Sequence, residues 1–265
     1  MNYTSFITNV LQETSEIASD KFGKVTGFTK GDDNNQVLTE ADLEIGKLIV
    51  EKIQKEYPAY NIIDEEAGTV DNGSDFTWVV DPIDGTSNFA NGVPTYGIML
   101  GLLERNLPIS GGVSLPYFKE IYIAEKGKGS YCNGRKILVA NEKKLSSSLI
   151  AYGIDGHQEN PSLTYEEIKI LGEIVLKCRN LRSSNSVFDL MTVVNGGYGG
   201  FLNKISKIWD NVAPQILIEE AGGLYTDFFG ELIDYTNPLQ KVAQNFTCCA
   251  ASPVLHKQLQ AIIHR

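Results

Sequence analysis

The sequence predicts a layered α+β fold in which helices are interleaved with mostly antiparallel strands. Apolar residues recur at helical spacing near both ends of the 265-residue chain. Between Tyr96 and Tyr131, apolar or alternating runs are punctuated by Gly and Pro, as in an antiparallel sheet. No internal repeat, low-complexity tract or long linker interrupts the sequence, so we expect a single domain over residues 1–265. Its lobes should cover about 1–145 and 146–265, because residues 141–148 are polar and small.

Two amphipathic helices are expected in the N-terminal part. A polar, turn-rich segment over Lys30–Asn35 should separate them, and a short buried strand at Ile62-Ile63 should follow them. The first helix ends at Gly23 and is marked by apolar residues at helical spacing: Phe6, Ile7, Val10, Leu11, Ile17 and Ala18. The second runs from Thr39 to Tyr57-Pro58, with an apolar face of Leu43, Leu48, Ile49 and Ile53.

Helical spacing returns in the second half of the chain. It predicts helices over Glu166–Leu176, Asp189–Val194 and Val254–Ile263, with a strand opening at Phe201-Leu202. A further helix begins near Asn211 and ends at Gly222-Gly223. We expect Asp210 to be its N-cap and Pro214 to lie in its first turn, because proline disrupts a helix interior.

Composition narrows the classes of partner. The net charge of −10 argues against a nucleic-acid polymer or an anionic membrane as the main partner, because both would be repelled. An anionic small molecule could bind only where cations reverse the local charge. The N-terminus lacks a secretory pattern and no apolar run approaches the ~20 residues that span a bilayer, which predicts a cytoplasmic location. The four cysteines show no CxxC spacing and are expected to be reduced structural thiols, with Cys248 and Cys249 in a buried strand.

The most informative motif is the hexapeptide DPIDGT at residues 81–86, which follows an apolar, strand-like run. Asp81 and Asp84, three residues apart on a turn, could converge on hard cations. Gly85 and Thr86 lead into a segment whose free backbone N–H groups could hold a phosphate. Asp, Pro and Gly are also ordinary turn formers, so the hexapeptide alone leaves a structural and a functional interpretation open.

Other carboxylates stand where a helix or strand could bring them to the same point. Asp42 lies in a capping box that begins at Thr39, where a carboxylate is stabilised in its charged form and could orient a hydroxyl or a water. Glu65 and Glu66 follow a strand and point to opposite sides, so we favour Glu65 as the one that faces the site. Capping or a solvated turn would explain each of these residues, and Asp210, without any further role.

Convergence would change that interpretation. The carboxylates expected to converge are Glu65, Asp81, Asp84 and Asp210. Pairs ~4 Å apart would repel by about 4 kcal/mol each at an effective dielectric near 20, and bound cations would remove that repulsion. Oxygen ligands favour Mg²⁺ or Mn²⁺ over zinc, and two such ions could bridge a phosphate and activate a water.

Taken together, these segments closely resemble the inositol monophosphatase family. The resemblance covers nearly the whole chain, and the combination of its motifs is far more specific than any one of them. It is carried by TEAD at 39–42, DEE at 64–66, DPIDGT with Ser-Asn-Phe to residue 89, a Lys-Gly-Lys-Gly hairpin within 125–134, and WD with EAGG over 209–223.

The resemblance implies a layered α/β/α/β/α sugar-phosphatase fold, commonly dimeric, and Mg²⁺-dependent hydrolysis of a phosphomonoester that is frequently lithium-sensitive. Two or three ions are implied, with Mn²⁺ as a possible replacement. The implied ligands are Glu65, Asp81 and the Ile83 carbonyl for one ion, and Asp81, Asp84 and Asp210 for another.

The resemblance also implies that Thr86 with Asp42 orients the attacking water and that the amides of Gly85 and Thr86 bind phosphate. The expected substrate contacts are Gly85, Thr86, Ser183, Ser184, Asn203 and Asp210. The substrate end departs from the pattern, since family members that hydrolyse inositol phosphates carry a Glu where this chain has Asn203. They also carry Gly-Thr-Ala where this chain has Asn-Ser-Val at 185–187. A neutral amide in place of an anionic acceptor weakens the case for inositol as substrate.

The sequence leads to three functional hypotheses. The leading one is Mg²⁺-dependent hydrolysis of a small phosphorylated metabolite, such as an inositol, sugar or histidinol phosphate. A second is a nucleotide-directed phosphatase of the same superfamily that acts on a 3′-phosphoadenosine or dinucleotide phosphate. The third is a metal-binding regulatory protein that has lost turnover, which is disfavoured because every motif carboxylate is present.

Overall fold

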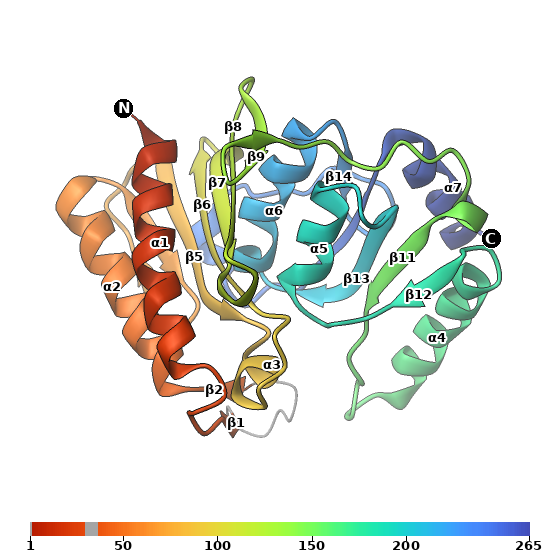
Figure 1. Ribbon diagram of the computed structural model, residues 1–265, viewed down its shortest axis with the longest axis horizontal. Coiled ribbons are helices and arrows are strands. Elements are labelled where there is room, and N and C mark those ends of the chain that lie inside the picture. Colours follow the sequence, from red (N-terminus) through yellow and green to blue (C-terminus); the bar gives the residue numbers. More distant parts are fainter. Residues whose placement is uncertain (1, 30–36) are drawn as a thin grey trace.

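The computed structural model describes residues 2–29 and 37–265, and these residues form five alternating layers of helices and sheets (Figure 1). Two helices cover the outer face of an eight-stranded sheet, two lie between this sheet and a five-stranded sheet, and two cover the far side. The helices are α1 (Tyr3–Lys21), α2 (Glu40–Glu56), α3 (Thr86–Ala90), α4 (Pro161–Val175), α5 (Val187–Val194), α6 (Ile208–Glu220) and α7 (Pro253–Ile263). The predicted layered fold is confirmed.

The larger sheet is antiparallel except where β3 pairs with β5, as the sequence predicted for its central part. In spatial order its strands are β10 (Arg135–Lys136), β9 (Gly129–Cys132), β8 (Glu120–Glu125), β7 (Leu107–Leu115), β6 (Gly97–Glu104), β5 (Phe76–Asp84), β3 (Asn61–Asp64) and β4 (Gly68–Val70).

The smaller sheet is mixed, because β11 pairs in parallel with both β12 and β13. Its spatial order is β12 (Asn180–Arg182), β11 (Leu149–Gly153), β13 (Gly200–Ser206), β15 (Phe246–Ala251) and β14 (Leu224–Thr226). A separate pair joins β1 (Phe28–Thr29) to β2 (Val37–Leu38), and short 3₁₀ helices lie at Pro116–Phe118, Leu145–Ser147 and Pro238–Gln240. The polar turn predicted at Lys30–Asn35 lies outside the described residues.

Helix α2 begins at the predicted capping box. The Thr39 N–H donates to Asp42 Oδ2 at 2.8 Å, and the Thr39 hydroxyl accepts the Ala41 N–H at 3.2 Å. The prediction of its buried face is partly wrong, because Leu43 is 52% exposed. The face that packs on the sheet repeats every four residues instead, through Ala41, Ile45, Ile49 and Ile53.

Helix α6 differs from the prediction at two points. Lys207 is its N-cap, and Asp210 stands at the third helical position, where its Oδ2 accepts the Lys207 N–H at 2.5 Å. Asp210 therefore supports the helix start from inside the first turn. Pro214 lies in the helix interior, so it has no N–H to donate to the Asp210 carbonyl four residues earlier.

Two other helices also begin earlier than expected. α4 begins at Pro161 instead of Glu166, since proline suits the first helical turn, and α5 begins at Val187 instead of Asp189.

Glycine allows the second half of the chain to pack closely on the first sheet. A Cβ at Gly101 of β6 would lie 2.7 Å from Val212 Cγ1, so only glycine lets α6 approach the strand this closely.

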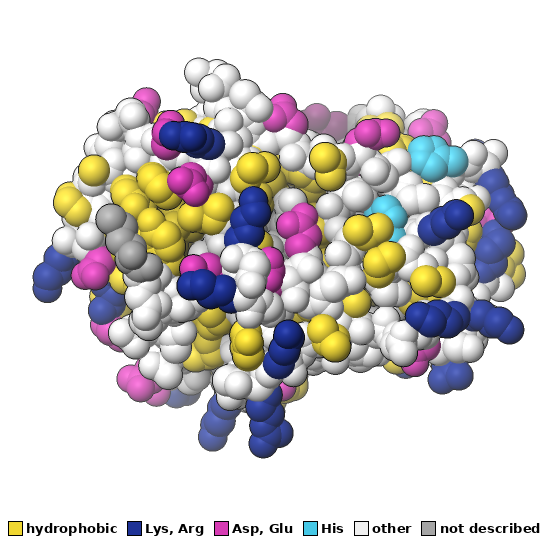
Figure 2. Space-filling view, turned by 90° about the horizontal axis from the view of Figure 1, so that it is seen from above, with side chains coloured by type: hydrophobic (Ala, Val, Ile, Leu, Met, Phe, Trp, Pro, Cys, Tyr) yellow, Lys and Arg dark blue, Asp and Glu magenta, His cyan; other side chains and the backbone are white. Residues whose placement is uncertain are grey.

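The surface charges, the cysteines and the helix lengths can be compared with the expectations from composition. Figure 2 shows acidic and basic side chains interspersed over one face, so the net charge of −10 is not concentrated there. Cys248 and Cys249 are buried in β15, and all four thiols are free, as predicted. None of the helices in 2–29 and 37–265 is long and apolar enough to cross a membrane.

Two motifs that lie about ninety residues apart in sequence meet through one carboxylate. Glu220, from the EAGG segment at the end of α6, accepts the N–H of Gly127 on Oε1 and the N–H of Gly129 on Oε2, both at 2.7 Å. Gly127 lies in the turn between β8 and β9, and Gly129 is the first residue of β9, both in the Lys-Gly-Lys-Gly hairpin. These two motifs therefore have a structural role: the Glu220 carboxylate holds a hairpin of the first sheet against the middle helix layer.

We expect Glu220→Ala to destabilise the protein by about 2–3 kcal/mol, because two charge-assisted hydrogen bonds are lost at once. The thermal midpoint should fall by about 4–10 °C in a calorimetric scan. Glu219→Ala is the matched control, since the Glu219 carboxylate accepts a hydrogen bond within its own helix, from Gln215 Nε2 at 2.8 Å, and interacts with Lys126 of the hairpin through charge. Equal shifts in the two variants would mean that the contact with the hairpin is energetically unimportant.

Candidate metal centre

Three carboxylates from two elements meet between the sheets. Oxygens of Asp81 and Asp84, on β5, and of Asp210, on α6, all lie within 4.8 Å of one another. The predicted turn at Asp81–Asp84 is wrong, because β5 continues through Asp84. On a regular strand, residues three apart point to opposite faces, but the pairing with β6 shifts register between Asp81 and Asp84. This irregularity lets both side chains project to the same side.

Backbone donors fix two of the three carboxylates. Asp84 Oδ2 accepts the N–H of Val187 at the start of α5, and Asp210 Oδ2 accepts the N–H of Lys207. Asp81 is 1% exposed, and its Oδ1 has no hydrogen-bond partner among the described residues. Burying a carboxylate oxygen without a hydrogen-bond donor costs free energy, and a bound cation would remove that cost.

Burial and mutual repulsion oppose ionisation of this cluster. Burial raises the pKa of Asp81 and of Asp84 well above the ordinary range, and neighbouring carboxylates raise each further. Burial also raises the pKa of Asp210 to about 6, although its backbone hydrogen bond acts in the other direction. The all-oxygen donor set and the accumulated negative charge suit a hard divalent cation such as Mg²⁺.

Glu65 lines the same cavity beside this cluster, but it is not one of the three carboxylates that lie within 4.8 Å. Its charge contributes to the raised pKa of Asp81. Glu66 is outside the described cavity wall, and its charge raises the pKa of Asp42 instead. Asp64 holds this turn, because its Oδ1 accepts the N–H groups of Glu66 at 2.9 Å and of Ala67 at 2.6 Å.

Thr86 links the cavity to Asp42. The Thr86 hydroxyl, at the start of α3, lies 3.1 Å from Asp42 Oδ1 and 2.8 Å from the Ile83 carbonyl oxygen. Asp42 also accepts the Thr39 hydroxyl at 2.5 Å. The expectation that Asp42 is stabilised in its charged form is wrong, because burial raises its pKa more than these hydrogen bonds lower it.

The cavity has a volume of about 360 Å³ and is lined from both halves of the chain. Gly85, with φ of 80°, forms part of its wall next to α3, and a Cβ there would lie 2.8 Å from Ser186 Cβ. The predicted site residues that line it are Glu65, Asp81, Ile83, Asp84, Gly85, Thr86, Asn203 and Asp210. Asp42 stands behind Thr86.

Two predicted substrate contacts are not in this wall. Ser183 donates its hydroxyl to Asn185 Oδ1 at 3.1 Å, and the hydroxyl of Ser184 pairs with that of Ser186 at 3.0 Å. They therefore support residues that line the cavity instead of lining it themselves. The sequence prediction did not place Asp155, Asn185 or Lys207 in the site, although all three line the cavity. Asn185 was noted only as a departure from the family pattern, and Lys207 stands near the WD motif.

Comparison with known proteins decides the family. Residues 2–265 match the model of the family described as "Inositol monophosphatase family". The chain belongs to the inositol monophosphatase family. It is accordingly a phosphoric monoester hydrolase by class, as the motifs predicted.

Relatives and solved structures agree with this assignment. A "Fructose-1,6-bisphosphatase/inositol-1-monophosphatase" of Aquifex aeolicus is 31% identical over 80% of this chain and 80% of its own. A "Nus factor SuhB" of Xylella fastidiosa is 33% identical over 72% of this chain and 69% of its own. Among solved structures, an "IMPase" of Thermotoga maritima superposes with a TM-score of 0.87 at 26% identity, covering 100% of this chain and 97% of that one. This inositol monophosphatase family member therefore shares the fold of its relatives along its whole length.

Proposed function

We propose that this protein hydrolyses a small phosphomonoester in a reaction that depends on Mg²⁺. The observation that carries the proposal is the meeting of Asp81, Asp84 and Asp210 within 4.8 Å in the wall of a cavity. Carboxylates packed this closely favour cations, and cations in turn attract the phosphate that an acidic protein would otherwise repel. We also propose a cytoplasmic location, as the sequence predicts, and a homodimer that is inhibited by lithium, on the strength of the family resemblance alone.

The ligand sets that we propose combine strand and helix residues. Glu65, Asp81 and the Ile83 carbonyl would hold one ion, and Asp81, Asp84 and Asp210 another, with Mn²⁺ as a possible replacement and a third ion possible. A carbonyl oxygen has two lone pairs, so the Ile83 oxygen can accept the Thr86 hydroxyl and still bind a cation. Bound Mg²⁺ ions would neutralise the phosphate and make a water easier to deprotonate.

Protein groups would then place the phosphate and the attacking water. The N–H groups of Gly85 and Thr86 can donate to phosphate oxygens, since residues at a helix start have no helical acceptor. When Thr86 donates its single hydroxyl proton to Asp42, its oxygen can accept a proton from a water on the cavity side. The raised pKa of Asp42 makes this carboxylate a better proton acceptor at the end of that chain.

The proposal is tested by measuring phosphate release from inositol, sugar, histidinol and nucleotide monophosphates, with and without Mg²⁺ and with Mg²⁺ plus lithium. We expect release that requires Mg²⁺ and favours one class of ester. The bifunctional name of the Aquifex relative supports including sugar phosphates. The Nus factor name of the Xylella relative supports the regulatory alternative. No release from any ester under any condition would favour that alternative and contradict the proposal.

A further inference from the structure

One carboxylate of the cavity wall has no part in the proposed metal centre. Asp155 lies two residues beyond the end of β11, in the loop that leads to α4, and it lines the cavity while remaining half-buried. Among its partners is Asn185, whose Nδ2 donates to Asp155 Oδ1 at 3.0 Å. Asn185 lies in the segment before α5, so two chain segments form this part of the wall together.

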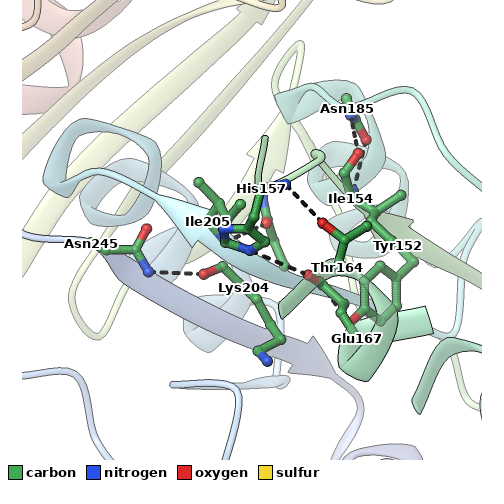
Figure 3. Close-up of polar contacts among 10 residues, drawn as sticks. Tyr152, Ile154, His157, Thr164, Glu167, Asn185, Lys204, Ile205 and Asn245 are labelled. Atoms are coloured by element: carbon green, nitrogen blue, oxygen red, sulfur yellow. Dashed lines mark hydrogen bonds and ion pairs between the residues drawn. The ribbon is translucent and has the colours of Figure 1, made fainter. Parts of the chain in front are cut away.

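The loop that carries Asp155 is held by polar contacts on both sides of this residue. On one side, Asn185 makes two hydrogen bonds to Ile154, accepting its N–H at 3.0 Å and donating to its carbonyl at 2.8 Å (Figure 3). On the other side, the His157 N–H donates to the Thr164 hydroxyl at 2.8 Å, and His157 Nε2 lies 4.0 Å from the buried carboxylate of Glu167. Anchors on both sides give Asp155 a fixed position in the wall.

Asn203, one of the positions at which this chain departs from the family pattern, lines the same cavity and pairs with the residue two positions before Asp155. Gly153, at the end of β11, pairs directly with Asn203 of β13, and a Cβ on Gly153 would lie 3.0 Å from Asn203 Nδ2. Asn203 Oδ1 accepts the Ile205 N–H at 2.8 Å, so Asn203 can offer a ligand its Nδ2 donor together with the second lone pair of Oδ1. This region of the wall thus combines an acceptor carboxylate, Asp155, with an amide donor.

Charge decides which part of a substrate can face this region. A carboxylate repels a phosphate, and Asp155 is not among the clustered carboxylates of the proposed metal centre, where a cation would reverse that repulsion. The phosphate is therefore excluded from the Asp155 side of the cavity. A neutral group with O–H donors fits there, because hydrogen bonds to a carboxylate are stronger than those to a neutral acceptor.

We propose that Asp155 is the residue that recognises the hydroxyl groups of the substrate, with Asn185 as the positioning residue that orients it. This inference rests on the proposed function and narrows it to phosphomonoesters of polyols or sugars. Asp155 supplies an anionic acceptor in the loop after β11, in a cavity wall that also holds the neutral amide of Asn203. The recognition of hydroxyls is thereby separated from the carboxylates that hold the cations.

The test compares substrates with and without hydroxyls in the Asp155→Ala and Asp155→Asn variants. The substrates are inositol 1-phosphate, glucose 1-phosphate and p-nitrophenyl phosphate, which has no hydroxyl group. We expect Asp155→Ala to lower kcat/KM for the first two by about 10- to 100-fold, mostly through KM, and to leave p-nitrophenyl phosphate within about 3-fold. Asp155→Asn keeps an acceptor oxygen and should lie between Asp155→Ala and the parent protein.

The matched control is Glu159→Gln, because Glu159 is an exposed carboxylate of the same loop and is outside the described cavity wall. It should leave all three substrates unchanged. Equal losses on every substrate, or no loss on any, would overturn the role of Asp155. A parent protein that releases no phosphate from any of the three esters in Mg²⁺ would instead contradict the proposed function, so the two failures are distinguishable.

Discussion

Replacing Asp84 or Asp210 by asparagine is expected to lower kcat by at least about 10³-fold, because bound cations supply several kcal/mol of transition-state stabilisation. An amide removes the negative charge that attracts the cation while keeping the size of the side chain. It also keeps an acceptor oxygen, so the backbone donors Val187 and Lys207 retain a partner. Far-UV circular dichroism should therefore be unchanged.

The assay should follow phosphate release across a Mg²⁺ titration. If the losses come from weaker cation binding, higher Mg²⁺ should recover part of the activity in each variant. Asp20→Asn is the control, since Asp20 is an exposed carboxylate near the end of α1 and does not line the cavity. Full activity in both Asp84→Asn and Asp210→Asn would mean that the three-carboxylate cluster is not the catalytic centre.

The sequence predicted those elements whose signals are local. The capping box at Thr39 is decided by residues within one turn, and it appears in the structure as expected. Which face of the following helix is buried depends on more distant residues. Leu43 and Ile45 are both apolar, and packing on the sheet determines which of them is buried. The same reasoning applies to Pro214, where the packing of α6 between two sheets overrides the local cost of proline.

The candidate site was predictable to the extent that motifs carried it. Asp81, Asp84 and Asp210 were identified from DPIDGT and WD, but their meeting depends on an irregularity in β5 that residue spacing does not reveal. Asp155 was missed for a different reason. It is a lone carboxylate in a loop, and its partner Asn185 lies 30 residues away, so only the fold brings the two together.

Asp81→Asn is expected to stabilise the metal-free protein while abolishing its response to Mg²⁺. In the metal-free parent the buried cluster favours bound protons, and the pKa of Asp210 rises to about 6 from an ordinary value of 3.8. The folded state therefore binds more protons than the unfolded state, and stability falls as the pH rises from about 4 through 6. Removing one charge from the cluster should weaken this fall, because burial and neighbouring carboxylates also raise the pKa of Asp81.

Mg²⁺ should make the parent protein more stable than Asp81→Asn, the reverse of the order expected without metal. At pH 8 and about 100 times its dissociation constant, a cation that binds only the folded state adds about 2.7 kcal/mol. The thermal midpoint of the parent should then rise by about 5–10 °C, whereas that of Asp81→Asn should barely move. Scanning calorimetry with EDTA or Mg²⁺, at pH 5 and pH 8, measures all four conditions. A parent protein that is equally stable with and without Mg²⁺ at pH 8 would show that repulsion among these carboxylates is not what the cation relieves.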